Sequence, residues 1–365
     1  MTRTPVARTL PDFPWDSLAD VTARAAAHEG GLVDLSVGTP VDPVAPVIRE
    51  ALASVADRPG YPTTAGTPEL RAAASAALER RYGLAGIPAD AVLPVIGSKE
   101  AIAWLPRLLG FGIGDTVVIP ELAYPTYEVG ALLAGARVLR ADGTAQVGPA
   151  PVSMVYVNSP SNPTGKVLGV DHLRKVVDWA RQRGAIVVSD ECYLGLGWDA
   201  EPVSILDPRV TGGSLDGLLA VHSLSKTSSL ASYRAAFIAG DPGLVAELLA
   251  VRKHAGMMVP LPIQAAMTAA LSEDEHERIQ RERYGRRRAI LKEAVLGAGL
   301  RIDDSEAGLY LWATRGEPCR DTVDWFADRG ILVAPGEFYG PRGGEHVRIA
   351  LTASDERIEA AAARL

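Results

Sequence analysis

The sequence predicts an α/β protein in which a large domain carries a mainly parallel sheet and a smaller α+β domain follows. Two observations predict this class. From about Leu93 onward, short β-branched runs alternate with amphipathic helical stretches, and several of the runs are apolar at nearly every position. Continuous apolar runs are typical of strands that helices cover on both faces. Alternation with helices favours parallel pairing, because each parallel connection needs a crossover segment.

Seven candidate strands form the expected sheet of the large domain. They are Val92–Ile96, Thr116–Pro120, Ala136–Arg140, Met154–Asn158, Ala185–Ser189, Leu218–His222 and Ala235–Ala239. The stretches between them have helical periodicity. One such helix is expected to begin at Asp171, which can serve as the N-cap, and to end at Gly184 in the C′ position. These elements predict a seven-stranded, mainly parallel sheet.

The chain changes character near Pro260–Pro262. A long helical region follows, and its charged part indicates a solvated face. Fewer strands and one-sided helices then indicate a smaller α+β domain. Its expected elements are strand-like Gly308–Thr314, helix Asp321–Arg329, strands Ile331–Ala334 and His346–Thr352, and a last helix from about Asp355. We therefore expect a large domain at residues 41–262 and a small domain at residues 263–365.

Composition excludes several classes of protein. The chain has 365 residues, of which 47% are apolar and 22% charged, so it can bury the core of a two-domain enzyme. Its net charge of −7 is spread without a basic stripe, which argues against a nucleic-acid partner. Two cysteines and six histidines show no disulfide framework or metal-ligand spacing. Without an apolar run of about eighteen residues or a signal peptide, a reduced cytoplasmic protein with no membrane partner is expected.

Polar residues follow five of the predicted strands. They are Ser98 and Lys99, Asn162, Asp190 with Tyr193, Ser223 to Lys226, and Arg234. Each alone has an ordinary structural explanation, such as an N-cap, a turn or a helix entry. Ligands of open α/β sheets bind at the carboxyl ends of the strands, so together these groups predict one crevice. It would contain an amine, a carboxylate, an amide, a phenol and anion-binding groups.

Three of these segments, with their order and spacing, carry a family resemblance. They are Asn162-Pro163-Thr164-Gly165, Asp190-Glu191-Cys192-Tyr193 and Ser223-Leu224-Ser225-Lys226. Further matches are Tyr61-Pro62, Gly66 to Arg71, Tyr124-Pro125-Thr126-Tyr127, Arg234 and Arg348. Over most of its length the chain resembles the class I/II, fold-type I aminotransferases. The resemblance implies pyridoxal 5′-phosphate as the cofactor of the large domain, and an N-terminal arm, residues 1–40, that packs with the small domain.

The resemblance also implies roles around the cofactor ring. Lys226 would hold the cofactor as a Schiff base and then act as the general acid and base that moves the substrate proton. Asp190 would pair with the pyridinium nitrogen, so that the ring can accept electrons. Tyr193 and Asn162 would hydrogen-bond the O3′ atom of the ring. Tyr124 would stack on the ring face.

Other residues would bind the phosphate. Ser98 and Lys99 open a helix whose N-terminal amides can face an anion, and Ser223 and Arg234 would add donors. The family equivalent of Tyr61 reaches the phosphate of the neighbouring subunit, which implies a homodimer with shared active sites. The family often has glycines beside the phosphate arginine. Here small residues flank Arg234 instead, so a slightly altered loop is expected.

The substrates would be an amino-acid donor and a 2-oxo-acid acceptor. Arg348 would clamp the substrate α-carboxylate with its planar fork, and Gly38 would offer a backbone amide nearby.

The finer resemblance is to the actinobacterial N-succinyldiaminopimelate aminotransferases. It lies in residues 10–16, 36–43, 191–198 and 334–342. It implies amino transfer from N-succinyl-LL-diaminopimelate to 2-oxoglutarate, a step of lysine and diaminopimelate biosynthesis. Such a substrate has a distal carboxylate, for which Arg252, Lys253 and Arg342 are the candidate partners.

Other functions remain open at this point. A transaminase of the same fold could act on aspartate or on LL-diaminopimelate directly, and a cystathionine β-lyase-like enzyme shares the cofactor. A non-catalytic effector sensor is a rival of another class. About thirty residues precede Leu32, too few for a helix-turn-helix domain with its linker, which disfavours the sensor.

Overall fold

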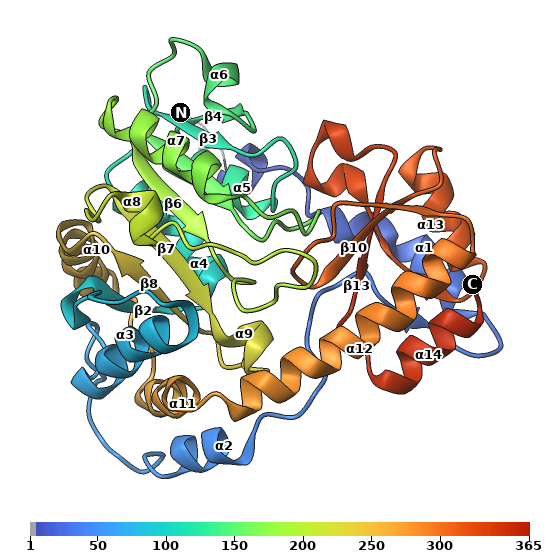
Figure 1. The fold of residues 1–365 in the computed structure, drawn as a ribbon, viewed down its shortest axis with the longest axis horizontal. Coiled ribbons are helices and arrows are strands. Elements are labelled where there is room, and N and C mark those ends of the chain that lie inside the picture. The colour runs from blue at the N-terminus through green and yellow to red at the C-terminus, as the bar shows by residue number, and fades with distance from the viewer. Residues whose placement is uncertain (1–4) are drawn as a thin grey trace.

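The computed structural model describes residues 5–365 and has a seven-stranded sheet at its centre (Figure 1). The strand order is β2-β8-β7-β6-β5-β3-β4. All neighbouring pairs are parallel except those of β8, which is antiparallel to β2 and to β7. The strands are β2 (Val92–Ile96), β3 (Thr116–Ile119), β4 (Arg137–Arg140), β5 (Met154–Asn158), β6 (Ile186–Asp190), β7 (Leu218–Ser223) and β8 (Ala235–Gly240). The predicted α/β class and mainly parallel sheet are confirmed.

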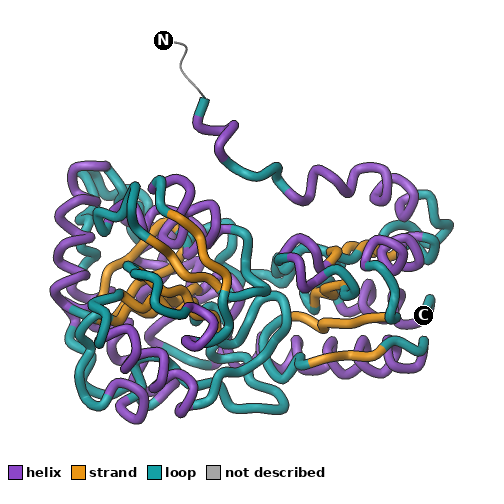
Figure 2. Tube along the Cα trace, turned by 90° about the horizontal axis from the view of Figure 1, so that it is seen from above, coloured by secondary structure: helices purple, strands orange, loops and turns teal. Residues whose placement is uncertain are grey.

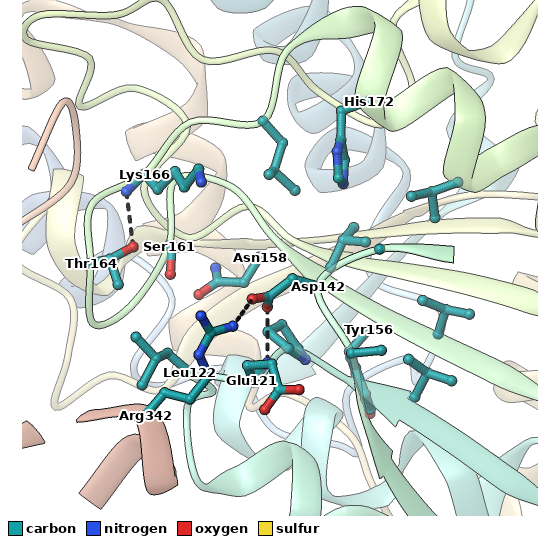
Figure 3. Close-up of a pocket in the computed structure, with 18 of the residues that line it drawn as sticks. Glu121, Leu122, Asp142, Tyr156, Asn158, Ser161, Thr164, Lys166, His172 and Arg342 are labelled. Atoms are coloured by element: carbon teal, nitrogen blue, oxygen red, sulfur yellow. Dashed lines mark hydrogen bonds and ion pairs between the residues drawn. The ribbon is translucent and has the colours of Figure 1, made fainter. Parts of the chain in front are cut away.

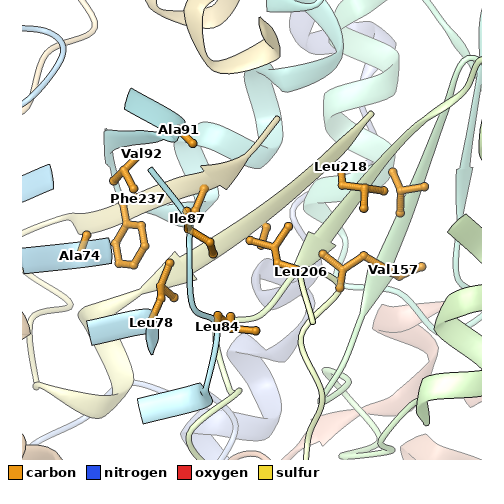
Figure 4. Packing of buried hydrophobic residues seen from close by; sticks show 14 of the residues in the cluster. Ala74, Leu78, Leu84, Ile87, Ala91, Val92, Val157, Leu206, Leu218 and Phe237 are labelled. Carbon is orange, nitrogen blue, oxygen red and sulfur yellow. The ribbon is translucent and has the colours of Figure 1, made fainter. Parts of the chain in front are cut away.

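Both faces of this sheet are buried, as its apolar strands predict. Along β5, Val155 and Val157 belong to one apolar cluster, and Met154 and Tyr156 belong to another on the opposite face. Figure 4 shows part of the first cluster, in which strand and helix side chains interlock. The surrounding helices are α2 (Pro46–Ala53), α3 (Pro68–Tyr82), α4 (Ser98–Leu108), α5 (Thr126–Ala134), α6 (Thr144–Val147), α7 (Val170–Arg181), α8 (Pro208–Thr211), α9 (Leu224–Thr227) and α10 (Pro242–Ala255).

The predicted start and end of helix α7 are wrong by a few residues. The N-cap is Gly169, in an extended conformation, and Asp171 lies inside the first turn. A carboxylate there still stabilises the helix through its dipole, so the sequence signal was real but shifted. The helix ends at Arg181, and Gly184 follows its C-cap, Gln182, by two residues at a φ of +66°.

A four-stranded antiparallel sheet, in the order β12-β13-β10-β9, forms the centre of the second part of the molecule. The predicted strand 331–334 is two short strands. Its first half pairs with β1 near the N-terminus, whereas its second half pairs with β13. The elements are β1 (Val33–Asp34), β9 (Arg301–Asp303), β10 (Tyr310–Thr314), β11 (Ile331–Leu332), β12 (Ala334–Pro335), β13 (Val347–Ala350), and helices α1 (Ala19–Ala26), α12 (Glu275–Gly297), α13 (Cys319–Ala327) and α14 (Asp355–Ala363). Long helix α12 reaches from α9, beside the large sheet, to this part (Figure 1).

The N-terminal segment runs along the outside of this second part (Figure 2). Strand β1 pairs in parallel with β11, and Arg24 of α1 pairs with Asp324 of α13. Helix α11 (Leu261–Ser272) packs against α2 and α3, and Met267 joins the core of the large sheet. The division of the chain at residues 40 and 262 stays a prediction.

None of the helices in residues 5–365 has the length and apolar character that a membrane span requires.

Candidate functional site

A cavity of about 690 Å³ lies where β6 and β7 end. Side chains of β10 and β13 and of the N-terminal segment complete its wall. Eleven predicted site residues line it: Gly38, Ser98, Lys99, Tyr124, Asn162, Asp190, Tyr193, Ser223, Lys226, Arg234 and Arg348. The structure therefore brings residues from both parts of the chain to one place.

Asp190 is the last residue of β6, and its carboxylate is buried and held by two donors. Tyr127 donates its hydroxyl to Oδ2 at 2.8 Å, and the backbone N–H of Cys192 donates to Oδ1 at 3.2 Å. On the neighbouring strand, the Asn158 amide donates to the Asp190 carbonyl at 2.9 Å. Burial raises the pKa of Asp190, and the bonds from Cys192 and Tyr127 oppose the rise. The result is a fixed hydrogen-bond acceptor inside the cavity.

Lys226 lies on the short helix α9 that follows β7. Its amine donates to the carbonyl of Gly38, and its own carbonyl accepts from the hydroxyl of Tyr284 at 3.0 Å. Burial lowers the pKa of Lys226, while Tyr310 and Cys192 oppose this shift. A lowered pKa increases the fraction of neutral, nucleophilic amine. The carbonyl of Gly38 thus contacts the lysine, whereas the predicted role of its N–H stays a prediction.

Groups that could bind an anion lie near Gly97, at the start of helix α4. Ser98 opens that helix, whose first N–H groups have no partner within the helix. The Arg234 guanidinium lies so close to Gly97 that a side chain there would collide with it. Arg234 itself has a φ of +55°, and its Nη1 donates to the Ala231 carbonyl at 2.8 Å. Ser223, which also lines the cavity, caps helix α9 through its hydroxyl.

Arg348 on β13 is a buried guanidinium with fixed partners. Its Nη1 donates to Asn162 Oδ1 at 2.8 Å, and its Nη2 donates to the Ser36 carbonyl at 2.6 Å. Its charge lies 4.0 Å from the ring centre of Tyr310, in a cation–π contact. Its Nε is buried and has no hydrogen-bond partner among residues 5–365.

Sequence reasoning missed two tyrosines of the site. Tyr310 shares a hydrogen bond of 3.0 Å with Tyr193, and burial raises the pKa of Tyr193 well above its ordinary value. Tyr127 was quoted only as part of a motif, although it holds Asp190. Tyr310 begins an apolar strand and Tyr127 lies near the start of a helix that is mostly apolar beyond Glu128, so neither can be distinguished from a core residue by its sequence alone. Phe13 and Trp15 of the N-terminal segment also line the cavity.

Four predicted residues lie elsewhere. Tyr61 has a side chain that is 97% exposed. Arg252 is buried and paired with Glu100 at 3.0 Å, Lys253 lies on α10, and Arg342 lines a different cavity. Among the residues that the structure describes, none of these three cations lines the site. The expectation that one of them contacts a distal substrate carboxylate is wrong for this cavity.

Comparison with known proteins gives consistent matches. Residues 31–365 match the family described as aminotransferase class I and II. The chain is 69% identical over 360 residues to a probable aminotransferase of Mycobacterium tuberculosis. The aligned residues cover 99% of this chain and 86% of that protein. It is 60% identical over 358 residues to the 4-dedimethylamino-4-oxo-anhydrotetracycline transaminase of Streptomyces rimosus, covering 98% and 99% of the two chains.

A solved aminotransferase structure from Neisseria meningitidis has the same fold. The TM-score is 0.88 at 31% identity, over 99% of this chain and 98% of that one. Fold, site and sequence therefore agree. This chain belongs to the class I and II aminotransferases, fold-type I.

Proposed function

We propose that this aminotransferase moves the amino group of N-succinyl-LL-diaminopimelate to 2-oxoglutarate, in lysine and diaminopimelate biosynthesis. The observation that carries the catalytic part is the cavity in which Lys226, Asp190 and Arg348 meet. The assignment of the substrate depends on the four stretches of sequence that resemble N-succinyldiaminopimelate aminotransferases.

Members of this family use pyridoxal 5′-phosphate, and the residues of the cavity fit that group. A buried amine, a buried carboxylate and an anion site are what its aldehyde, ring nitrogen and phosphate require. Lys226 and Asp190 supply the first two, and we assign the third to Ser98, Ser223 and Arg234. A side chain at position 97 would displace the Arg234 guanidinium from its observed place. We assign Tyr124 to the ring face, with Asn162 and Tyr193 beside it.

The bound cofactor supplies an electron sink for negative charge at the substrate Cα. The chain supplies the other parts of the reaction. Asp190 would keep a proton on the ring nitrogen that faces it. The amine of Lys226 would take the proton from the substrate Cα and deliver it again on the product side. Arg348 would orient the substrate through its α-carboxylate, because its guanidinium lines the cavity.

Lys99 is the cation that we assign to the distal carboxylate. It lines the cavity, and its ammonium lies 5.6 Å from the ring centre of Phe13, on the side of the N-terminal segment. Its exposed side chain is distinct from the backbone N–H groups of helix α4 that would face the phosphate. The phosphate role predicted for Lys99 and this substrate role make different predictions for cofactor affinity.

We also propose a homodimer with shared active sites. The Tyr61 side chain is 97% exposed, so it is free to contact a partner subunit. In the dimer, Tyr61 would reach the phosphate of the other subunit. We further propose that the enzyme works in the cytoplasm, where cysteines remain reduced; Cys192 and Cys319 are both free and buried.

A donor screen of the purified holoenzyme tests the function. Glutamate formation from 2-oxoglutarate is measured with N-succinyl-LL-diaminopimelate, LL-diaminopimelate and aspartate. We expect the succinylated donor to have the highest kcat/KM, and Lys226→Ala to show no turnover. Equal or faster reaction of a free amino acid would remove the substrate assignment and leave the aminotransferase. Pyruvate and ammonia from cystathionine would instead identify a β-lyase.

A second acceptor class comes from the relative in Streptomyces rimosus. Its name describes a fused-ring ketone as the substrate, and it is 60% identical to this chain. The same screen should therefore include 4-dedimethylamino-4-oxo-anhydrotetracycline as an acceptor with glutamate as donor. A kcat/KM above that for the succinylated substrate would favour this function.

A further inference from the structure

A second cavity, of about 340 Å³, lies on the α7 side of the large sheet (Figure 3). It shares no lining residue with the active-site cavity, although Asn158, Ser161 and Thr164 line it from the same loop that carries Asn162. That loop, residues 158–166, is therefore the wall between the two spaces. A volume of this size is sufficient for a small organic molecule.

The inner surface of this cavity is apolar. Strands β3 and β5 contribute one side, and helices α6 and α7 contribute the other. The side chains concerned are Val118, Val155, Val157, Val147, Val176 and Trp179. Burial of apolar atoms against such a surface favours a hydrocarbon body of aromatic size.

The mouth carries charges of both signs. Arg342 and Asp142 face each other on one side of the cavity in Figure 3, with their charged atoms 3.6 Å apart. Lys166 and His172 lie on the other side, and Asp304 also lines the cavity. The Lys166 ammonium has no hydrogen bond or ion pair within residues 5–365. Burial, and then Lys166, lower the pKa of His172, so this imidazole is neutral near pH 7.

One buried atom of this cavity lacks a partner. His346 lies against Trp312, with ring centres 5.0 Å apart, and its Nε2 is 2.8 Å from Asp303 Oδ2. Its Nδ1 is buried and has no hydrogen-bond partner among the described residues. In the neutral tautomer that donates from Nε2, Nδ1 is an acceptor and needs a donor. An unpaired buried acceptor costs free energy, so the wall of the cavity at His346 is not optimised for the empty state.

We propose that this cavity binds a free amino acid with an aromatic side chain. The side chain occupies the apolar interior. The α-carboxylate pairs with Lys166, and the α-ammonium faces the carboxylate of Asp304. A simple anion would meet the carboxylates of Asp142 and Asp304, and a simple cation would meet Lys166 and Arg342. A zwitterion complements both signs.

Occupancy of this cavity is coupled to the active site through Asn158. Its Oδ1 accepts from the Asn162 N–H at 2.7 Å, and its Nδ2 donates to the Asp190 carbonyl at 2.9 Å. Trp312, which also lines the second cavity, pairs with Arg348 across β10 and β13. A ligand that orders these residues changes substrate affinity, and the substrate changes ligand affinity by the same factor.

Calorimetric titration of the holoenzyme with L-phenylalanine and L-tryptophan tests the proposal. We expect saturable binding of at least one. Three relatives of phenylalanine test its parts: 3-phenylpropionate lacks the ammonium, phenethylamine lacks the carboxylate, and glycine lacks the ring. Each should bind roughly tenfold or more weakly, because each leaves one feature unpaired. Absence of binding by both amino acids, or equal binding of 3-phenylpropionate, would overturn the proposal.

Variants separate this site from the active site, which can also hold amino acids. Lys166→Met should weaken binding roughly tenfold, whereas Lys175→Met, on the exposed side of α7, should leave it unchanged. Arg348→Gln should retain the binding that Lys166→Met loses. The reverse pattern would place the amino acid in the active site and refute a second site. Since these readouts measure binding, they stand whether or not the proposed transamination is correct.

Discussion

Tyr127 offers a sharp test of how the protein controls Asp190. Tyr127→Phe removes a single hydroxyl whose hydrogen bond to Asp190 Oδ2 is 2.8 Å long and fully buried. The ring should stay in place, because it stacks on Tyr156 with ring centres 4.8 Å apart. A buried hydrogen bond to a charged group contributes about 1.5–3 kcal/mol. If the reaction needs the ionised carboxylate, that loss corresponds to about one to two decades in kcat/KM.

The substitution Tyr127→Phe should also change the pH dependence of kcat/KM in a definite direction. The hydrogen bond from Tyr127 lowers the pKa of Asp190, against the rise that burial causes. Its removal raises that pKa further, so the carboxylate becomes protonated at a higher pH as the solution is acidified. The acid limb of the kcat/KM profile should therefore move to higher pH. The assay is glutamate formation as a function of pH.

Tyr156→Phe is the matched control for this prediction. Its hydroxyl donates to the Ile102 carbonyl, also at 2.8 Å, so the substitution removes a buried bond of the same length without touching Asp190. We expect this control to change stability but to leave the acid limb in place. Identical pH profiles for the two variants would refute the role given to Tyr127.

Three further variants test other parts of the site. Arg348→Lys keeps the charge but loses the planar fork, so KM for the amino donor should rise roughly ten- to a hundredfold with a smaller change in kcat; steady-state kinetics measures both, and an unchanged KM would contradict the clamp. Lys99→Met should raise KM for the succinylated donor but not for glutamate; a weaker affinity for the cofactor instead, measured by titration of the apoenzyme, would support the phosphate role. Tyr61→Ala and Lys226→Ala should each be inactive, yet random hybrid dimers should regain about a quarter of wild-type activity, because half of the dimers then hold one intact site. No gain on mixing would exclude shared sites.

The large sheet could be predicted from the sequence because its strands are apolar on both faces. Strands β2 and β5 were predicted with their observed bounds, and the other five differ by one residue at one or both ends. The predicted N-cap of α7 failed because Asp171 can stabilise a helix either as a cap or in its first turn. The prediction of one strand over residues 331–334 was wrong because β11 pairs with β1, about 300 residues earlier in the chain.

The sequence could predict those site residues whose positions are determined by the order and direction of the strands. Asp190 and Asn158 end neighbouring parallel strands, so their positions follow from the sheet. The residues that hydrogen-bond to the site residues come from distant parts of the chain, so no local sequence pattern identifies them. Tyr127 is 63 residues from Asp190, and Arg348 is 186 residues from Asn162. A tyrosine such as Tyr127 has the same sequence surroundings as one that only fills the core.

Asp190 and Lys226, the two groups on which the proposed reaction depends, are held by different parts of the protein. Asp190 is fixed by Tyr127 and Asn158, and both lie in elements of the large sheet and its covering helices. Lys226 is held by the carbonyl of Gly38, from the N-terminal segment, and by Tyr284 of α12. The carboxylate is thus placed by the sheet and its helices, as the proposed role of Asp190 in holding a proton on a fixed ring requires. In the proposed mechanism the Lys226 amine moves a proton between two carbon atoms. The carbonyl of Gly38 that it contacts lies outside the sheet, so displacement of that segment would free the amine without changing the bonds to Asp190.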